Sequence, residues 1–216
     1  MAWLSRAEQT IPLGSQTFSK SKMSVPLGSA PLYAQSAKGA RFTDVDGKEY
    51  LDFVNGLLCV NLGYRDPDVD AAIRAQLESG ITFSLPHTLE AEVAELMVEH
   101  IPCAQMVRFG KNGSDATSAA IRIARAHTGR EHIAVCGYHG WQDWYIGSTT
   151  RDLGVPVSTK QLTHKFTYNN LDSLKALLED KAKPLAAVIM EPMNLEAPYP
   201  GFLEGVKALC EEHGTV

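Results

Sequence analysis

A polar turn, KNGSD, interrupts the segment RFGKNGSDATSAAIRIARAHTGR between a short apolar stretch and a helical pattern. The first N–H groups of a helix have no intrahelical partner and lie at the positive end of its dipole, so an anion is stabilised there. Gly113 lacks the Cβ that would hold a phosphate away, Ser114 offers a hydroxyl, and Asn112 offers an amide. These three residues predict a phosphate site, with simple capping of the helix as the alternative.

Aromatic side chains follow a second apolar stretch, in GYHGWQDWY. A flat conjugated ligand stacks well on such rings, and Tyr138 and His139 are the candidates. For Trp141, Trp144 and Tyr145 we expect instead a place in the core or in an interface.

Glu191 stands where a third apolar stretch, LAAVIM, ends. A carboxylate at the end of a buried strand is costly unless it meets a cation, a hydrogen-bond donor or a ligand. Glu191 is therefore a candidate site residue, with a solvated loop acid as the alternative.

Elements of two kinds alternate beyond residue 104, which predicts an α/β fold with a mostly parallel sheet and helices on both faces. Ligands bind such sheets at the carboxyl ends of the strands, so the three loops described above should meet at one edge. The expected strands are 105–109, 132–136 and 185–190, and the expected helices are 114–128, 171–180 and 201–213.

The first hundred residues are organised differently. Residues 1–37 show little periodicity and predict an extended arm. Asp46-Gly47 lies between two alternating segments, which indicates a hairpin. Residues 67–79 and 88–101 have the pattern of surface helices, each with one buried stripe.

Composition excludes several function classes. The 216 residues are 44% hydrophobic and 21% charged, with a net charge of −5 that is not gathered into blocks, so we expect no nucleic-acid partner. LAAVIM is too short to span a bilayer and the N-terminus has no signal-peptide pattern, so we expect no membrane partner and a cytoplasmic protein. The four widely spaced cysteines predict reduced, mostly buried thiols.

Four motifs together resemble class III aminotransferases, in particular the glutamate-1-semialdehyde 2,1-aminomutase-like group. They are the NGSDA turn with its helix, the GYHG loop, the MEP loop and the early FTDVDGKEYLDFVNG hairpin. The resemblance runs from about residue 15 to the end of the chain. It implies a fold-type I transferase that binds pyridoxal 5′-phosphate (PLP) and moves an amino group between a small-molecule amine donor and a carbonyl acceptor. It also implies a homodimer.

The resemblance assigns roles residue by residue. Asn112, Gly113 and Ser114 fall on the phosphate-binding positions. Tyr138 falls on the residue that stacks on the cofactor ring, with His139 beside it, and Glu191 falls on the acid near the ring hydroxyl. Glu196 falls on a position that contacts the cofactor or gates a substrate-binding arginine in some members, but Leu195 replaces a glycine common there, which weakens that assignment.

The chain departs from the family pattern at its end. Thr215-Val216 look like the start of another strand, and the family's ring-nitrogen aspartate and Schiff-base lysine have no counterpart. Lys160, Lys165 and Lys207 are predicted to be solvated. We therefore expect the N-terminal part of a larger enzyme, incomplete at the C-terminus, without a catalytic residue and inactive alone.

In that reading residues 1–60 are the arm and hairpin of a small domain, and residues 61–216 begin the large cofactor-binding domain. Transamination is favoured over the aminomutase reaction, because after the hairpin aminomutases carry an aromatic-containing segment near the substrate, whereas NGLLCVNLG here offers only Asn55 and leucines. The aminomutase and a non-catalytic phosphate-binding α/β module remain as alternatives.

Overall fold

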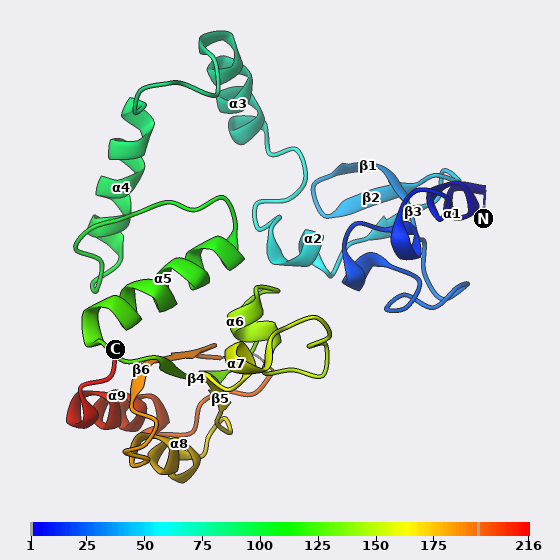
Figure 1. The fold of residues 1–216 in the computed structure, drawn as a ribbon. Helices are drawn as coiled ribbons and strands as arrows, with labels where there is room; N and C mark the ends of the chain where they lie inside the picture. Colours follow the sequence, from blue (N-terminus) through cyan, green and yellow to red (C-terminus); the bar gives the residue numbers. More distant parts are fainter. Residues whose placement is uncertain (1, 194) are drawn as a thin grey trace. The chain divides into compact units, whose positions relative to one another are not determined.

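The computed structural model describes residues 2–193 and 195–216. The chain divides after Glu90 into two compact units, the second running from Ala91 to Val216 (Figure 1). The assignment of residues 1–60 to a small domain stays a prediction.

The first unit begins with a helix, and a small three-stranded sheet follows within its first 51 residues. The sequence predicted only an extended arm and a hairpin there. The hairpin is confirmed, since β2 and β3 pair antiparallel and Gly47 takes a φ of 83° in the turn. The extended arm is wrong at both ends. Leu4 is buried in the first helix, and the last arm residues form a third strand against β2. The elements are α1 (Ala2–Ala7), η1 (Pro12–Gly14), η2 (Phe18–Lys20), β1 (Ala34–Lys38), β2 (Arg41–Asp44) and β3 (Glu49–Leu51).

Three helices follow, namely α2 (Asn55–Leu58), α3 (Pro67–Ser79) and α4 (Thr88–His100). The last two are confirmed, and the side chain of Asp66 caps α3 by accepting from the N–H groups of Asp68 and Val69. Their buried stripes are wrong. Neither helix contains a buried residue, and apolar side chains such as Ile73 of α3 and Leu96 of α4 are more than half exposed.

The second unit contains a parallel sheet, as predicted. Its strands are β4 (His132–Cys136), β5 (Thr163–Lys165) and β6 (Leu185–Met190), in the order β5-β4-β6. Its other helices are α5 (Gly113–Thr128), α6 (Asp143–Ile146), α7 (Val157–Lys160), α8 (Leu171–Leu178) and α9 (Phe202–His213). α5 begins at its Asn112 cap and α9 ends at Gly214, which adopts a left-handed conformation.

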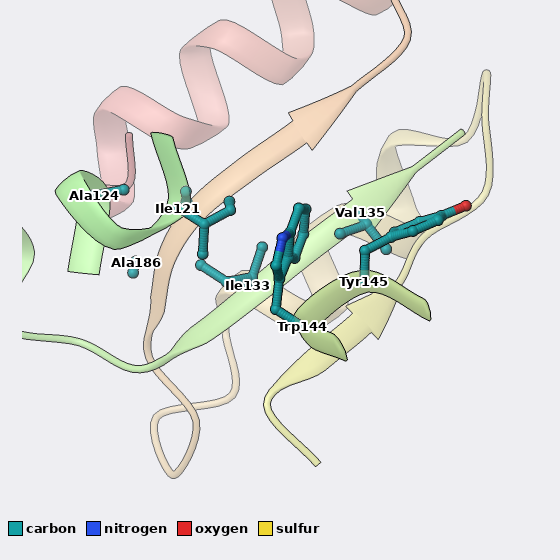
Figure 2. Packing of buried hydrophobic residues seen from close by; sticks show 8 residues of the cluster. Ile121, Ala124, Ile133, Val135, Trp144, Tyr145 and Ala186 are labelled. Atoms are coloured by element: carbon teal, nitrogen blue, oxygen red, sulfur yellow. The ribbon is translucent and has the colours of Figure 1, made fainter. Parts of the chain in front are cut away.

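One face of this sheet carries α5 and α6. Ile133 and Val135 point from β4 toward the rings of Trp144 and Tyr145, and Ile121 of α5 completes this layer (Figure 2). The expected core placement is therefore confirmed for Trp144 and Tyr145. Trp141 is 68% exposed and lies outside the core, so for this residue a place in an interface stays a prediction.

The opposite face carries α8 and α9. Ala134, whose side chain alternates with those of its two neighbours along β4, packs there with Leu174, Phe202 and Val206. Complete burial of a leucine such as Leu174 stabilises a fold by about 1.5–3 kcal/mol. The predicted two-sided covering of the sheet is confirmed.

Residues 105–109 do not form the predicted strand. A strand requires a hydrogen-bonded neighbour, and the described sheet offers this segment none. The outer edge of β6 is instead paired with Val216, which donates to Ala186 O (3.1 Å) and accepts from the N–H of Val188 (2.9 Å). This is the parallel pattern, in agreement with the strand-like reading of the last two residues.

The cysteine prediction is half right. All four cysteines are free thiols, but Cys59 and Cys103 are exposed and Cys136 and Cys210 are half-buried. No helix among the described residues is long and apolar enough to cross a membrane.

Candidate functional site

The carboxyl ends of β4 and β6 lie side by side. Cys136 pairs with Met190, and the N–H of Glu191 donates to Cys136 O at 3.1 Å. The loops that follow these strands therefore leave the sheet together, as parallel pairing requires. Glu191 also contacts the loop after β4, because a Cβ on Gly137 would lie 2.6 Å from the Glu191 Oε2.

The start of α5 meets the same loop. Gly140 rests on Ser114, and Thr117 donates its hydroxyl to His139 O at 2.9 Å. A second contact lies farther along the helix, where the indole Nε1 of Trp144 donates to Ser118 Oγ at 3.0 Å. The three loops after position 110, after β4 and after β6 are thus brought together in one unit.

The turn before α5 has the geometry of a helix start with open space above it. The Asn112 Oδ1 accepts from the N–H of Asp115 at 3.0 Å, so its side-chain oxygen is used in capping. A Cβ on Gly113 would meet nothing within 4 Å. The N–H groups of Gly113 and Ser114 stand at the first helical positions, where the helix itself provides no acceptor. Such free N–H groups at a helix start can donate to an anion.

The side chain of Tyr138 is exposed, whereas the side chain of its neighbour His139 is buried. The ring of Tyr138 is 63% exposed and meets Tyr145 edge-on at 5.7 Å, so one of its faces is available for stacking. His139 is only 6% exposed, its Nε2 lies 3.0 Å from Cys136 O, and its ring stacks on Trp144. Burial lowers the pKa of His139, although the Cys136 carbonyl and the charge of Glu191 oppose that shift. The neutral, buried ring of His139 thus stabilises the loop after β4 through its contacts with Cys136 O and Trp144.

Two acids and a tyrosine line a pocket of about 250 Å³ at this edge. Glu191 is half-buried, whereas Glu196 is exposed at the rim. Burial raises the pKa of the Tyr168 hydroxyl, and the charge of Glu196 raises it further. The lining residues are Cys136, Gly137, Tyr168, Glu191, Leu195 and Glu196.

Several contributors were missed by sequence reasoning. Thr117 and Ser118 look like ordinary helix residues, and nothing local shows that they bond a loop more than twenty residues away. Tyr168 belongs to YNN, a polar triplet before a helix, which resembles any capping turn. Gly137 could have been found, because a glycine directly after a buried strand often marks a close approach.

The family model described as aminotransferase class-III matches residues 23–216. The chain is 36% identical, over 99% of its length, to the 3-aminobutyryl-CoA aminotransferase of Cloacimonas acidaminovorans, and covers 52% of that protein. It is 40% identical, over 88% of its length, to glutamate-1-semialdehyde 2,1-aminomutase 2 of an Exiguobacterium species, and covers 47% of it.

Solved structures agree with these relatives. An omega-transaminase from Sphaerobacter thermophilus matches all of the chain with a TM-score of 0.89 and 31% identity, over 53% of its own length. The FumI protein of Sphingopyxis sp. MTA144, solved in its PLP internal aldimine form, matches 99% of the chain with a TM-score of 0.91 and 32% identity, over 52% of its own length. The chain therefore spans about half the length of the relatives it matches, and it belongs to the class-III aminotransferase family, with the fold-type I architecture of its PLP-dependent neighbours.

Proposed function

We propose that the chain forms the cofactor-anchoring half of a PLP-dependent aminotransferase, which moves an amino group from a small-molecule amine donor to a carbonyl acceptor. The convergence of three loops carries this proposal. Gly140 packs on Ser114 and Gly137 packs on Glu191, so the start of α5, the loop that carries Tyr138 and the carboxylate of Glu191 lie close together.

The residues present fit such a cofactor. The N–H groups of Gly113 and Ser114 would bind the phosphate, in the open space above the start of α5. The exposed face of Tyr138 would stack on the pyridine ring, and Glu191 would lie near the ring hydroxyl. His139 would hold the loop rather than contact the ring, since its side chain is buried.

The cofactor, when bound, supplies an electron sink that allows an amine to lose its Cα proton. That chemistry also needs a lysine that binds the cofactor covalently. No lysine is among the described residues that line the pocket. Lys160, one of the three lysines predicted to be solvated, is paired with Asp152 at 2.7 Å. We propose that the lysine comes from a part of the fold that the twice-longer relatives possess.

The complete enzyme is proposed to be a cytoplasmic homodimer without nucleic-acid or membrane partners. Support for the dimer comes from apolar side chains between residues 58 and 85, which a monomer would leave in water. They are 70–78% exposed and comprise Leu58, Leu62, Ile81 and Leu85.

An aminomutase is the second candidate, because the Exiguobacterium aminomutase is the more identical of the two relatives described. The two activities differ in their need for an external acceptor. A transaminase requires a keto acid for sustained turnover, whereas an aminomutase returns the amino group to the same carbon skeleton. Turnover of the complete enzyme without added keto acid would favour the aminomutase.

The cofactor-anchoring role is tested on the chain itself. Charge-assisted hydrogen bonds worth about 1.5–3 kcal/mol each leave little after the entropy of association, so PLP should bind only at about millimolar concentration. After borohydride reduction, mass spectrometry should find scattered, substoichiometric labelling of lysines and no amine transfer. One lysine labelled stoichiometrically, together with transaminase turnover, would contradict the proposal that the lysine lies elsewhere.

A further inference from the structure

We propose that Tyr168 and Asn169 are positioning residues that hold the loop after β6 so that Glu191 and Glu196 stay at the pocket. The inference rests on the proposed function, because it assigns to these two acids a cofactor or substrate to face. Neither Tyr168 nor Asn169 has a role in the cofactor contacts described above.

Asn169 binds the far end of this loop with both groups of its side-chain amide. Its Nδ2 donates to Ala197 O at 3.0 Å, and its Oδ1 accepts from the N–H of Tyr199 at 2.8 Å. Ala197 directly follows Glu196 in the sequence. One amide therefore fixes the backbone immediately after the second acid.

Tyr168 binds the near end of the same loop. Its hydroxyl donates to Pro192 O at 2.7 Å, and Pro192 directly follows Glu191. The ring meets Phe202 edge-on at 5.1 Å, which ties it to the core beneath α9, and it also lines the pocket. Each acid is thus held through the residue that follows it.

The backbone of Asn169 explains why an asparagine stands there. Its φ is 58°, in the left-handed region that asparagine and glycine enter more readily than other residues. The neighbouring Asn170 has a separate task, since its Oδ1 accepts from the N–H of Ser173 and caps α8. One asparagine holds the loop and the next begins the helix.

Glu191 and Glu196 both line the pocket, with Glu191 half-buried and Glu196 exposed. The bonds from Tyr168 and Asn169 hold the backbone at both ends of the segment that carries these two acids. Glu196 does lie close enough to Tyr168 for its charge to raise the pKa of the hydroxyl. The arrangement keeps negative charge available for a cationic or hydrogen-bond-donating group of the bound molecule.

The test uses the 216-residue chain and pyridoxamine 5′-phosphate, whose amine forms no Schiff base with surface lysines. Its affinity is measured by ring fluorescence and compared with that of inorganic phosphate. Asn169→Gly permits the same φ but removes both side-chain bonds. Tyr168→Phe keeps the ring packing and removes the hydroxyl. Asn170→Asp, which retains the capping oxygen, is the matched control.

We expect Asn169→Gly and Tyr168→Phe to weaken pyridoxamine 5′-phosphate binding about threefold to tenfold, the effect of one or two net hydrogen bonds. Inorganic phosphate should bind these variants as it binds the unmodified chain, because its contacts lie at α5. Hydrogen exchange of the Tyr199 amide should accelerate in Asn169→Gly, and Asn170→Asp should change neither affinity.

Two results would overturn this inference and leave the proposed function standing. One is an unchanged pyridoxamine 5′-phosphate affinity in Tyr168→Phe. The other is an equal loss of affinity for phosphate and for pyridoxamine 5′-phosphate in both variants. The first would show that the loop needs no such support, and the second would show general loss of structure. Failure of the unmodified chain to bind pyridoxamine 5′-phosphate at all would instead overturn the proposed function, and this inference with it.

Discussion

The backbone of Gly140 rests directly on the side chain of Ser114, so that a Cβ at position 140 would lie 3.0 Å from the Cβ of Ser114 and closer still to its Oγ. The loop after β4 can approach the start of α5 only because this residue is a glycine. Its φ of 108° adds a second reason, since side chains are strained in that conformation.

Gly140→Ala should therefore destabilise the chain by about 2–4 kcal/mol, from the strained φ and the displaced loop together. It should also weaken phosphate binding, because Ser114 must move. Urea denaturation and phosphate titration measure the two effects. Gly154→Ala is the matched control, since Gly154 has a φ of 85° but a Cβ there would meet nothing within 4 Å. Equal destabilisation by both substitutions would show that the contact with Ser114 has no importance.

Ser118→Ala should cost about 1–3 kcal/mol, because it leaves the buried indole N–H of Trp144 without its acceptor. A double-mutant cycle with Trp144→Phe separates this effect from packing. In the Trp144→Phe background no N–H remains to be satisfied, so the additional cost of Ser118→Ala should fall below about 0.5 kcal/mol. Strict additivity of the two substitutions would contradict the hydrogen bond.

What the sequence revealed follows from the range of each interaction. The helix at Gly113–Thr128 depends on a cap three residues away and on its own periodicity, so it was predicted almost to its ends. β5 was missed, because THK is short and polar and becomes a strand only by pairing with residues thirty positions earlier. Residues 105–109 show the converse, since an apolar segment without a partner forms no strand.

The site divides in the same way. A parallel sheet brings its loops to one edge, so the meeting of the Ser114, Tyr138 and Glu191 loops was predictable from the order of elements alone. The direction in which each side chain points could not be predicted in this way. Tyr138 and His139 are adjacent, yet one ring is exposed and the other is buried, because stacking on Trp144 draws the histidine inward.

Acidification should destabilise the chain through His164. Its ring lies 2.9 Å from the ring of His132, Nε2 to Nδ1, and its pKa is lowered by burial and then by the positive charges of His132 and Lys183. A basic group with a folded-state pKa below its unfolded value of about 6.5 stabilises the fold above that pH. This contribution is lost as the pH falls from about 6.5 through the lower folded-state pKa, since the unfolded chain binds the proton more tightly in that range.

The free energy of unfolding, measured by urea titration between pH 8 and pH 5, should therefore decline less steeply in His164→Gln than in the unmodified chain. His139 contributes in the same direction, because burial also lowers its pKa, so some decline should remain in the variant. His127→Gln is the control, as His127 is exposed on α5. Identical slopes for His164→Gln and the unmodified chain would exclude this role of the pair.

Asn112→Asp should separate helix capping from anion binding. An aspartate oxygen can accept from the N–H of Asp115 as the asparagine does, and a negative charge at a helix N-terminus is favourable, so stability should stay within about 0.5 kcal/mol of the unmodified chain. The same charge would repel a phosphate at Gly113 and Ser114, so phosphate and PLP affinity should fall by about tenfold.

Asn170→Asp makes the same exchange at the cap of α8, where no phosphate is proposed to bind, and should leave both affinities unchanged. Isothermal titration beside thermal unfolding reads the two properties separately. If Asn112→Asp bound phosphate as tightly as the unmodified chain, the anion site would have to be moved away from the start of α5.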